Sequence, residues 1–202
     1  MKELSDFNAN FAMMKSAVVF LSLLTCILFS GNRKSEVASD NPYDRLKCDS
    51  VVAYDYDGSG GRQIVKDNKL VMADGQHGRI FGQRILTEKQ IKKLHKIISN
   101  PRSYGRNIAS CFDPHLGIVY YLNKEIVGFI SICLDCNYLE SSAQIPASLS
   151  KKGFMDTEKS IAITLRGFSK SARHNLNEFC KELKFNTCKE SLDNDEIFDA
   201  YY

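Results

Sequence analysis

The sequence predicts an α+β domain, an antiparallel sheet with a central hairpin and two amphipathic helices packed on one face. Two β-rich runs on either side of Asn123 and Lys124 predict the hairpin, and two segments with apolar residues at helical spacing predict the helices. The chain has 202 residues, 44% of them hydrophobic and 25% charged, which suits one packed core and argues against a chain without fixed structure.

The predicted strands are runs rich in β-branched and aromatic residues. Residues 117–122 and 126–133 form the two arms of the central hairpin. Upstream, VVAYDYD and RQIVKD lie on either side of the glycine-rich GSGG, and this pattern predicts a second hairpin with a tight turn. A later run, SIAITL at residues 160–165, predicts a further strand.

The predicted helices each begin at a capping residue. Thr87 opens a capping box, so we expect a helix over about 88–98, with His95 near its polar face as an ordinary surface histidine. Ser169 caps the second helix. The residues expected to be buried are Ile91, Leu94 and Ile98 in the first helix and Ala172, Leu176, Phe179 and Leu183 in the second.

The N-terminal part predicts export. Lys15 precedes an apolar run of roughly 13 residues, the length of a secretory signal's hydrophobic region, whereas a spanning helix needs about 20. An uncleaved membrane anchor and a buried core helix remain the alternatives. The predicted organisation is a doubtful start plus signal segment over 1–31, a tether over 32–43, one α+β domain over 44–186 and a disordered acidic tail over 187–202.

The segment from Leu23 to Cys26 resembles the lipobox of bacterial lipoproteins, in which the cysteine becomes the lipidated first residue of the mature chain. The resemblance implies a lipid anchor at Cys26 and attachment to a membrane. Cleavage near Ser30 or Gly31 without a lipid is the alternative. Both forms predict an exported protein, either periplasmic or anchored in the cell envelope.

The charge and the motifs give little support to two large classes of function. The 27 Lys and Arg against 24 Asp and Glu leave a formal charge of +3, too small to predict a nucleic-acid partner. No G-x-S-x-G, H-E-x-x-H or P-loop pattern occurs, and no paired carboxylates suggest an acid and a base. We therefore favour a non-enzymatic role and leave catalysis open.

The candidate chemical residues flank the central hairpin: they are Cys111, His115, Cys133 and Cys136. If Leu122 faces Glu125, the register places Cys111 opposite Cys136. A register slipped by one residue places His115 opposite Cys133 instead. Since directly opposed Cβ atoms lie about 4.5 to 5.5 Å apart, both registers bring the four residues together at one end of the hairpin.

Three chemistries fit this cluster. Export favours a structural disulfide among the cysteines. All four side chains together also match a tetrahedral metal site for zinc or copper, the only cofactors that the sequence suggests. Thiol-disulfide exchange needs a cysteine of lowered pKa, usually at a helix N-terminus, and no helix is predicted after Cys136.

The remaining cysteines leave their pairing open. Cys180 borders the apolar stripe of the second predicted helix, so it is either a buried thiol or the partner of Cys48 or Cys188. Without Cys26, six cysteines remain, an even number that fits complete oxidation but allows 15 pairings.

The stretch C-F-x-P-H, followed by the hairpin and I-x-I-C-x-x-C, resembles a family of small uncharacterised exported proteins of Bacteroidota, many of them lipoproteins. The matching residues are Cys111, Phe112, Pro114, His115, Ile130, Ile132, Cys133 and Cys136. The resemblance covers about Ile85 to Phe185. It implies a small exported α+β domain and no particular activity.

The resulting functional hypothesis is an exported envelope protein with a binding or structural role. Its expected partners are the membrane, through the N-terminal lipid or signal segment, and another envelope protein. The alternative is a metal-binding protein that uses the zinc or copper site of the hairpin cluster.

Overall fold

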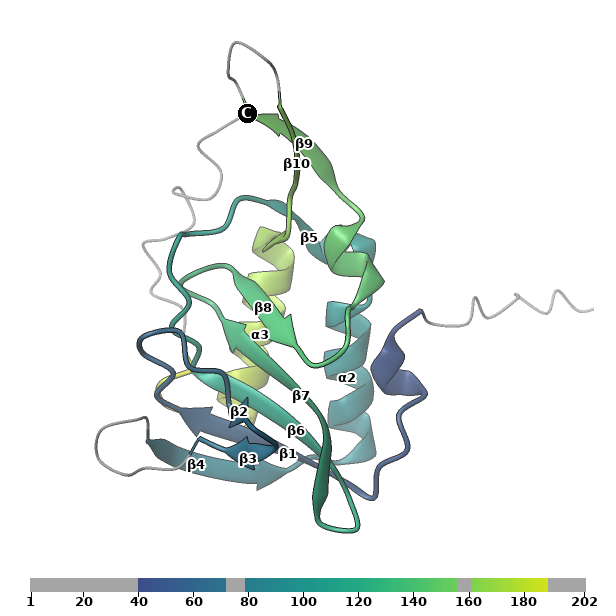
Figure 1. Ribbon diagram of the computed structural model, residues 1–202, viewed down its shortest axis with the longest axis vertical. Coiled ribbons are helices and arrows are strands. Elements are labelled where there is room, and N and C mark those ends of the chain that lie inside the picture. The colour runs from purple at the N-terminus through teal and green to yellow at the C-terminus, as the bar shows by residue number, and fades with distance from the viewer. Residues whose placement is uncertain (1–39, 72–78, 156–160, 189–202) are drawn as a thin grey trace, which may run out of the picture. The chain divides into compact units, whose positions relative to one another are not determined.

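The computed structural model describes residues 40–71, 79–155 and 161–188 of the chain (Figure 1). The predicted signal segment, Cys26, most of the tether and the acidic tail from Lys189 onward lie outside these residues. Within the described ranges, no helix is both long enough and apolar enough to cross a membrane. The first element of the described residues is a 3₁₀ turn over Pro42–Asp44, slightly before the predicted domain start.

A five-stranded antiparallel sheet forms the centre of the fold, in the order β4-β1-β6-β7-β8. The α+β class and the antiparallel sheet are thereby confirmed. The strands are β1 (Ser50–Tyr56), β4 (Ile80–Ile85), β6 (Leu116–Leu122), β7 (Glu125–Cys133) and β8 (Tyr138–Ser141). Since β1, β6 and β7 each have a partner strand on both sides, they are the most protected of these strands, while β4 and β8 are the edges.

Three small antiparallel pairs accompany this sheet. They are β2 (Val65–Lys66) with β3 (Lys69–Leu70), β5 (Tyr104–Arg106) with β11 (Gly167–Phe168), and β9 (Lys152–Met155) with β10 (Ile161–Thr164). The predicted strand at 160–165 corresponds to β10.

The predicted hairpin across GSGG is wrong, because β1 pairs with β4 and β6 and not with the segment that follows it. The backbone N–H groups of Tyr56 and Gly58 donate instead to the carbonyl oxygens of His115 and Pro114, at 3.1 and 3.0 Å. The chain then turns over the sheet, where Ile64 is fully buried. The glycine-rich turn thus packs against the approach to β6.

The α-helices of the described residues are α2 (Glu88–Ile98) and α3 (Lys170–Glu182). Thr87 forms the predicted capping box with Gln90, and the Ser169 hydroxyl accepts a hydrogen bond from the Ala172 N–H. These local signals satisfy backbone N–H groups that have no partner inside the helix, which explains why both helices begin where the sequence predicts. Two further 3₁₀ turns cover Pro101–Ser103 and Pro146–Leu149.

Two apolar clusters pack on the sheet because successive strand residues point to opposite faces. The larger cluster combines side chains from both helices, such as Leu94 and Leu176, with Ala53 and Ile118 from the strands. The smaller cluster contains Tyr54, Tyr56, Ile64, Val65 and Val119. Of the seven helix residues predicted to be buried, six are buried and Ile91 is partly buried.

The prediction of a surface histidine at position 95 is wrong. His95 is 7% exposed; its Nδ1 lies 2.5 Å from an Asp44 carboxylate oxygen and its Nε2 lies 2.8 Å from the Tyr120 hydroxyl. The Tyr120 ring in turn stacks on Tyr43 at a centroid distance of 4.8 Å. The segment before β1 therefore covers a helix flank that the helical wheel assigned to solvent.

Candidate functional site

The hairpin formed by β6 and β7 contains both of the predicted registers. Leu122 faces Glu125 beside the turn, but a β-bulge between Tyr120 and Tyr121 shifts the pairing, so that Leu116 faces Ile132 at the far end. The turn residues have φ angles of 52° and 71°, the left-handed values that a tight two-residue hairpin requires. The bulge determines which residues meet beyond the strand ends.

Three cysteine sulfurs meet at this far end. Cys133 and Cys136 form a disulfide, and the Cys111 thiol donates to Cys136 Sγ across 2.6 Å. Cys133 and Cys136 have no exposed surface, whereas Cys111 is exposed. The prediction of disulfide-bonded cysteines is thereby confirmed, with a bond that closes Cys133 onto Cys136.

His115 is oriented by a different part of the chain. Its Nδ1 lies 3.0 Å from the carbonyl oxygen of Tyr56, so this ring nitrogen is engaged with the end of β1. Among the described residues, no group of three or more His, Cys, Asp or Glu side chains is arranged to hold a metal ion. The zinc or copper site with Cys111, His115, Cys133 and Cys136 stays a prediction.

Backbone groups fix the sulfur atoms in place. The Cys136 N–H donates to Cys133 Sγ at 3.0 Å, and the Asp113 N–H donates to Cys136 Sγ at 3.3 Å. Asp113 is itself held, because its carboxylate accepts from the Gly60 N–H at 2.8 Å. A side chain at Gly58 would collide with Pro114, with Cβ only 2.4 Å from the Pro114 oxygen, so this close approach requires glycine.

The electrostatic surroundings disfavour the Cys111 thiolate. Burial and then the negative charges of Asp113 and Asp135 raise the pKa of the Cys111 thiol above its ordinary value. As expected from the sequence, Cys136 is followed by a turn and by β8 instead of a helix. The lowered cysteine pKa of thioredoxin-like catalysts therefore has no counterpart at Cys111.

A second disulfide closes the end of α3, where Cys180 pairs with Cys188. Of the alternatives left open for Cys180, the structure therefore contains the bridge to Cys188, while Cys48 and Cys111 are the free cysteines of the described residues. The chain beyond α3 also bonds to β1, because the Asp55 carboxylate accepts from the Asn186 N–H at 2.8 Å and from the Thr187 hydroxyl.

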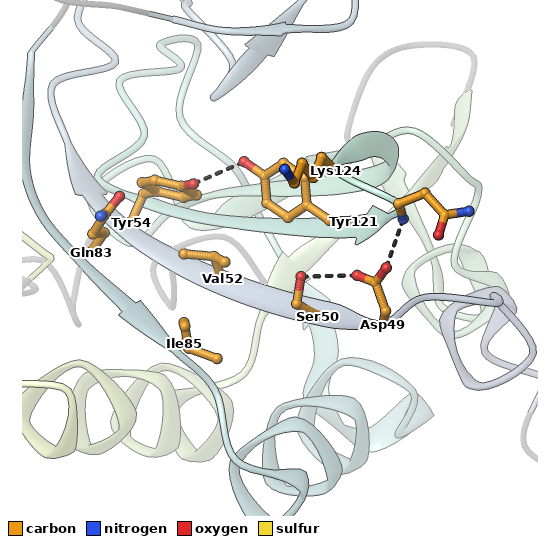
Figure 2. A pocket seen from close by; sticks show the side chains of 9 residues that line it. Asp49, Ser50, Val52, Tyr54, Gln83, Ile85, Tyr121 and Lys124 are labelled. Atoms are coloured by element: carbon orange, nitrogen blue, oxygen red, sulfur yellow. Dashed lines mark hydrogen bonds between the residues drawn. The ribbon is translucent and has the colours of Figure 1, made fainter.

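An open groove crosses the other face of the sheet, and sequence reasoning missed it (Figure 2). The Tyr54 and Tyr121 hydroxyls lie 2.8 Å apart at one end, while Asp49 accepts from the Ser50 hydroxyl and from the Asn123 N–H at the other. The lining residues are Asp49, Ser50, Val52, Tyr54, Gln83, Ile85, Tyr121, Asn123 and Lys124. The alternation of side chains between the two faces of β1 was the available signal for this groove, but its partner strand β4 was not predicted.

Strand β4 forms one wall of this groove and is also an edge of the sheet. Its apolar side chains are unusually open, with Ile85 76% and Phe81 46% exposed. Among the described residues, no strand pairs with the outer side of β4. Apolar side chains beside a sheet edge without a strand partner are the features to which an extended peptide can bind.

Comparison with known proteins found no match: no family model, no curated protein and no solved structure is significantly similar to this chain. The geometry defines a disulfide-bonded α+β domain with two distinct features, a three-cysteine cluster and an open groove beside an edge strand. Functional inference therefore depends on these two features.

Proposed function

We propose that the chain is an exported envelope protein that binds an extended segment of another protein along β4 and has no catalytic role. Export is supported by the two disulfides, Cys133–Cys136 and Cys180–Cys188, because such bonds persist mainly in oxidising compartments. The apolar run after Lys15 and the likeness to exported proteins of Bacteroidota support the same location. The N-terminal segment then provides the contact with the membrane.

In the proposed arrangement, one face of the sheet packs against the helices and the opposite face binds the partner. We place the hairpin of β6 and β7 at its centre and both helices on the face that contains Ala53 and Ile118. The opposite face then carries the groove. On that face, the segment around Ile64 and Val65 covers one part and leaves the part beside Ile85 open.

The observation that carries the proposal is the apolar exposure of an edge strand. Ile85, at 76% exposure, lies opposite Val52 of β1 and so projects toward the groove. An added strand would pair with the outer backbone groups of β4 and would cover Ile85 and Phe81 with its own apolar side chains. The partner is therefore a protein segment that is extended and has apolar residues at alternate positions.

Site-specific crosslinking in intact cells tests this proposal. A photoreactive benzoylphenylalanine in place of Ile85 should form a covalent adduct with one protein partner. The same residue in place of Phe154, which is 73% exposed on β9, is the matched control and should not form that adduct. Equal adducts from both positions, or no adduct from position 85, would contradict binding along β4.

Two measurements complete the test. With the crosslinker in place of Phe81, Ile85→Lys should reduce the adduct while the urea midpoint shows that the domain still folds. Fractionation should place the mature chain in the envelope, and its intact mass should show cleavage before Cys26 with diacylglycerol attached, or cleavage near Asn32 without it. A full-length unmodified chain in the cytosol would contradict export.

A further inference from the structure

The three-cysteine cluster consists of the Cys133–Cys136 disulfide and the Cys111 thiol, which lies in contact with it. Cys136 Sγ is bonded to Cys133 and lies 2.6 Å from Cys111 Sγ. We propose that the cluster is a thiol-disulfide exchange site, in which Cys136 pairs alternately with Cys133 and with Cys111 and a thiol of another molecule enters through Cys111. This inference is independent of binding along β4 and of export.

The exchange step is balanced within the chain. The Cys111 thiolate attacks Cys136 Sγ, a Cys111–Cys136 bond forms, and the Cys133–Cys136 bond breaks. The electron pair of the broken bond remains on the Cys133 sulfur, which takes up the proton that Cys111 lost. One disulfide and one thiol are present before and after the step, so it needs no oxidant or reductant.

The surroundings of the leaving sulfur suit this step. The Cys136 N–H already donates to Cys133 Sγ at 3.0 Å and would stabilise a thiolate there. After protonation, the Cys133 thiol has an acceptor in the Asp113 carbonyl oxygen, 3.3 Å away. Both states of Cys133 therefore have a partner without a rearrangement of the backbone.

Proximity and acidity act in opposite directions on the rate. Burial and the charge of Asp113 keep the pKa of the Cys111 thiol raised, so only a small fraction is thiolate near neutral pH. The attack is intramolecular, however, which gives the reacting sulfurs a high effective concentration. We expect slow exchange, on the order of minutes to hours, unlike the fast turnover of a dedicated oxidoreductase.

Exposure controls which pairing an external thiol can reach. Cys133 and Cys136 are 0% exposed, so their disulfide is shielded, whereas the Cys111–Cys136 disulfide includes the exposed residue Cys111. A glutathione thiolate would attack Cys111 Sγ and release the Cys136 thiol. A second glutathione would then restore the Cys111 thiol and leave as oxidised glutathione, so that two glutathione thiols supply the two electrons.

Tryptic mapping tests the exchange. Cleavage after Arg106, Lys124 and Lys151 places Cys111 in peptide 107–124 and the other two cysteines in peptide 125–151. The protein is incubated at about pH 8, where more thiol is ionised, and its free thiols are then blocked. The Cys133–Cys136 pairing leaves the two peptides separate, and the Cys111–Cys136 pairing links them.

We expect a linked fraction in the wild type and nearly complete linkage in Cys133→Ser, in which Cys111 is the remaining partner in the cluster. Absence of linkage in the wild type, or free Cys111 and Cys136 thiols in folded Cys133→Ser, would overturn the proposal. Asp-N digestion, which cuts between Leu134 and Asp135, identifies the cysteine that is joined to Cys111.

The entry role of Cys111 is tested by the rate of reduction with reduced glutathione. Cys111→Ser should slow reduction of the Cys133–Cys136 disulfide at least about tenfold, because both of its sulfurs are buried. Cys48→Ser is the matched control, since it removes the other free thiol of the described residues and should leave the rate unchanged. Equal rates in Cys111→Ser and the wild type would contradict entry through Cys111.

Discussion

The Cys180–Cys188 disulfide ties the end of α3 to the last described residues, and its contribution to stability can be estimated from the loop that it closes. The bonded cysteines are separated by 8 positions. In the chain-entropy account, a loop of this length stabilises the folded state by about 2.5 kcal/mol at room temperature. The double variant Cys180→Ala and Cys188→Ala should lose this amount. Alanine is preferable to serine because both sites are buried and a hydroxyl there would lack a partner.

Urea unfolding measures the loss. With a slope of about 2 kcal/mol per molar, the midpoint should fall by roughly 1 M in the double variant. Cys48→Ala, which removes a thiol outside both bridges, is the control and should change the midpoint far less. A shift of the double variant below about 0.25 M, equivalent to about 0.5 kcal/mol, would refute the estimate and the stabilising role of this bridge.

Three further predictions concern the core, a close contact and the cluster. Leu94→Ala should lower the free energy of unfolding by about 2 to 5 kcal/mol, because Leu94 is 0% exposed, and a change within about 0.5 kcal/mol would mean that it is not a core residue. Gly117→Ala should lower the free energy of unfolding in urea by about 1 to 3 kcal/mol, since its Cβ would lie 2.5 Å from Ile64 Cγ1. In a protein that also carries Ile64→Ala, the same substitution should lower it much less. Asp113→Asn should lower the pKa of Cys111, because a negative charge that opposes the thiolate is removed. The pH profile of iodoacetamide labelling at Cys111 should therefore shift toward lower pH. An unchanged profile would contradict this electrostatic effect.

The sequence predicted those parts of the fold that local chemistry determines. Thr87 and Ser169 cap helices where expected because a cap is formed by residues three positions apart. The strand runs around Asn123 were found for the same reason, since the turn and the alternation are both local. The disulfides were expected from the predicted export and from the number of cysteines, although the spacing did not fix which cysteines pair.

Features determined by contacts distant in sequence were missed. His95 is buried because Asp44, 51 residues earlier, covers that flank of α2, and a helical wheel contains no information about such a segment. The hairpin predicted after β1 failed because β4 and β6 occupy both edges of that strand. At the cluster, the bulge beside Tyr120 combines two registers that the sequence could treat only as alternatives.

The hydrogen bonds of Asp55 have a consequence for the order in which the chain can fold. This carboxylate lies on the first strand of the sheet, yet its described donors are the Asn186 N–H and two groups of Thr187, more than 130 positions later. During synthesis, β1 therefore leaves the ribosome long before the residues that complete its surroundings. A shorter nascent chain lacks these donors, so closing the sheet around Asp55 would not give this carboxylate the hydrogen bonds that it has in the complete domain, which disfavours early closure. Delayed closure favours an unfolded nascent chain, the state in which an exported protein of the kind proposed would cross a membrane.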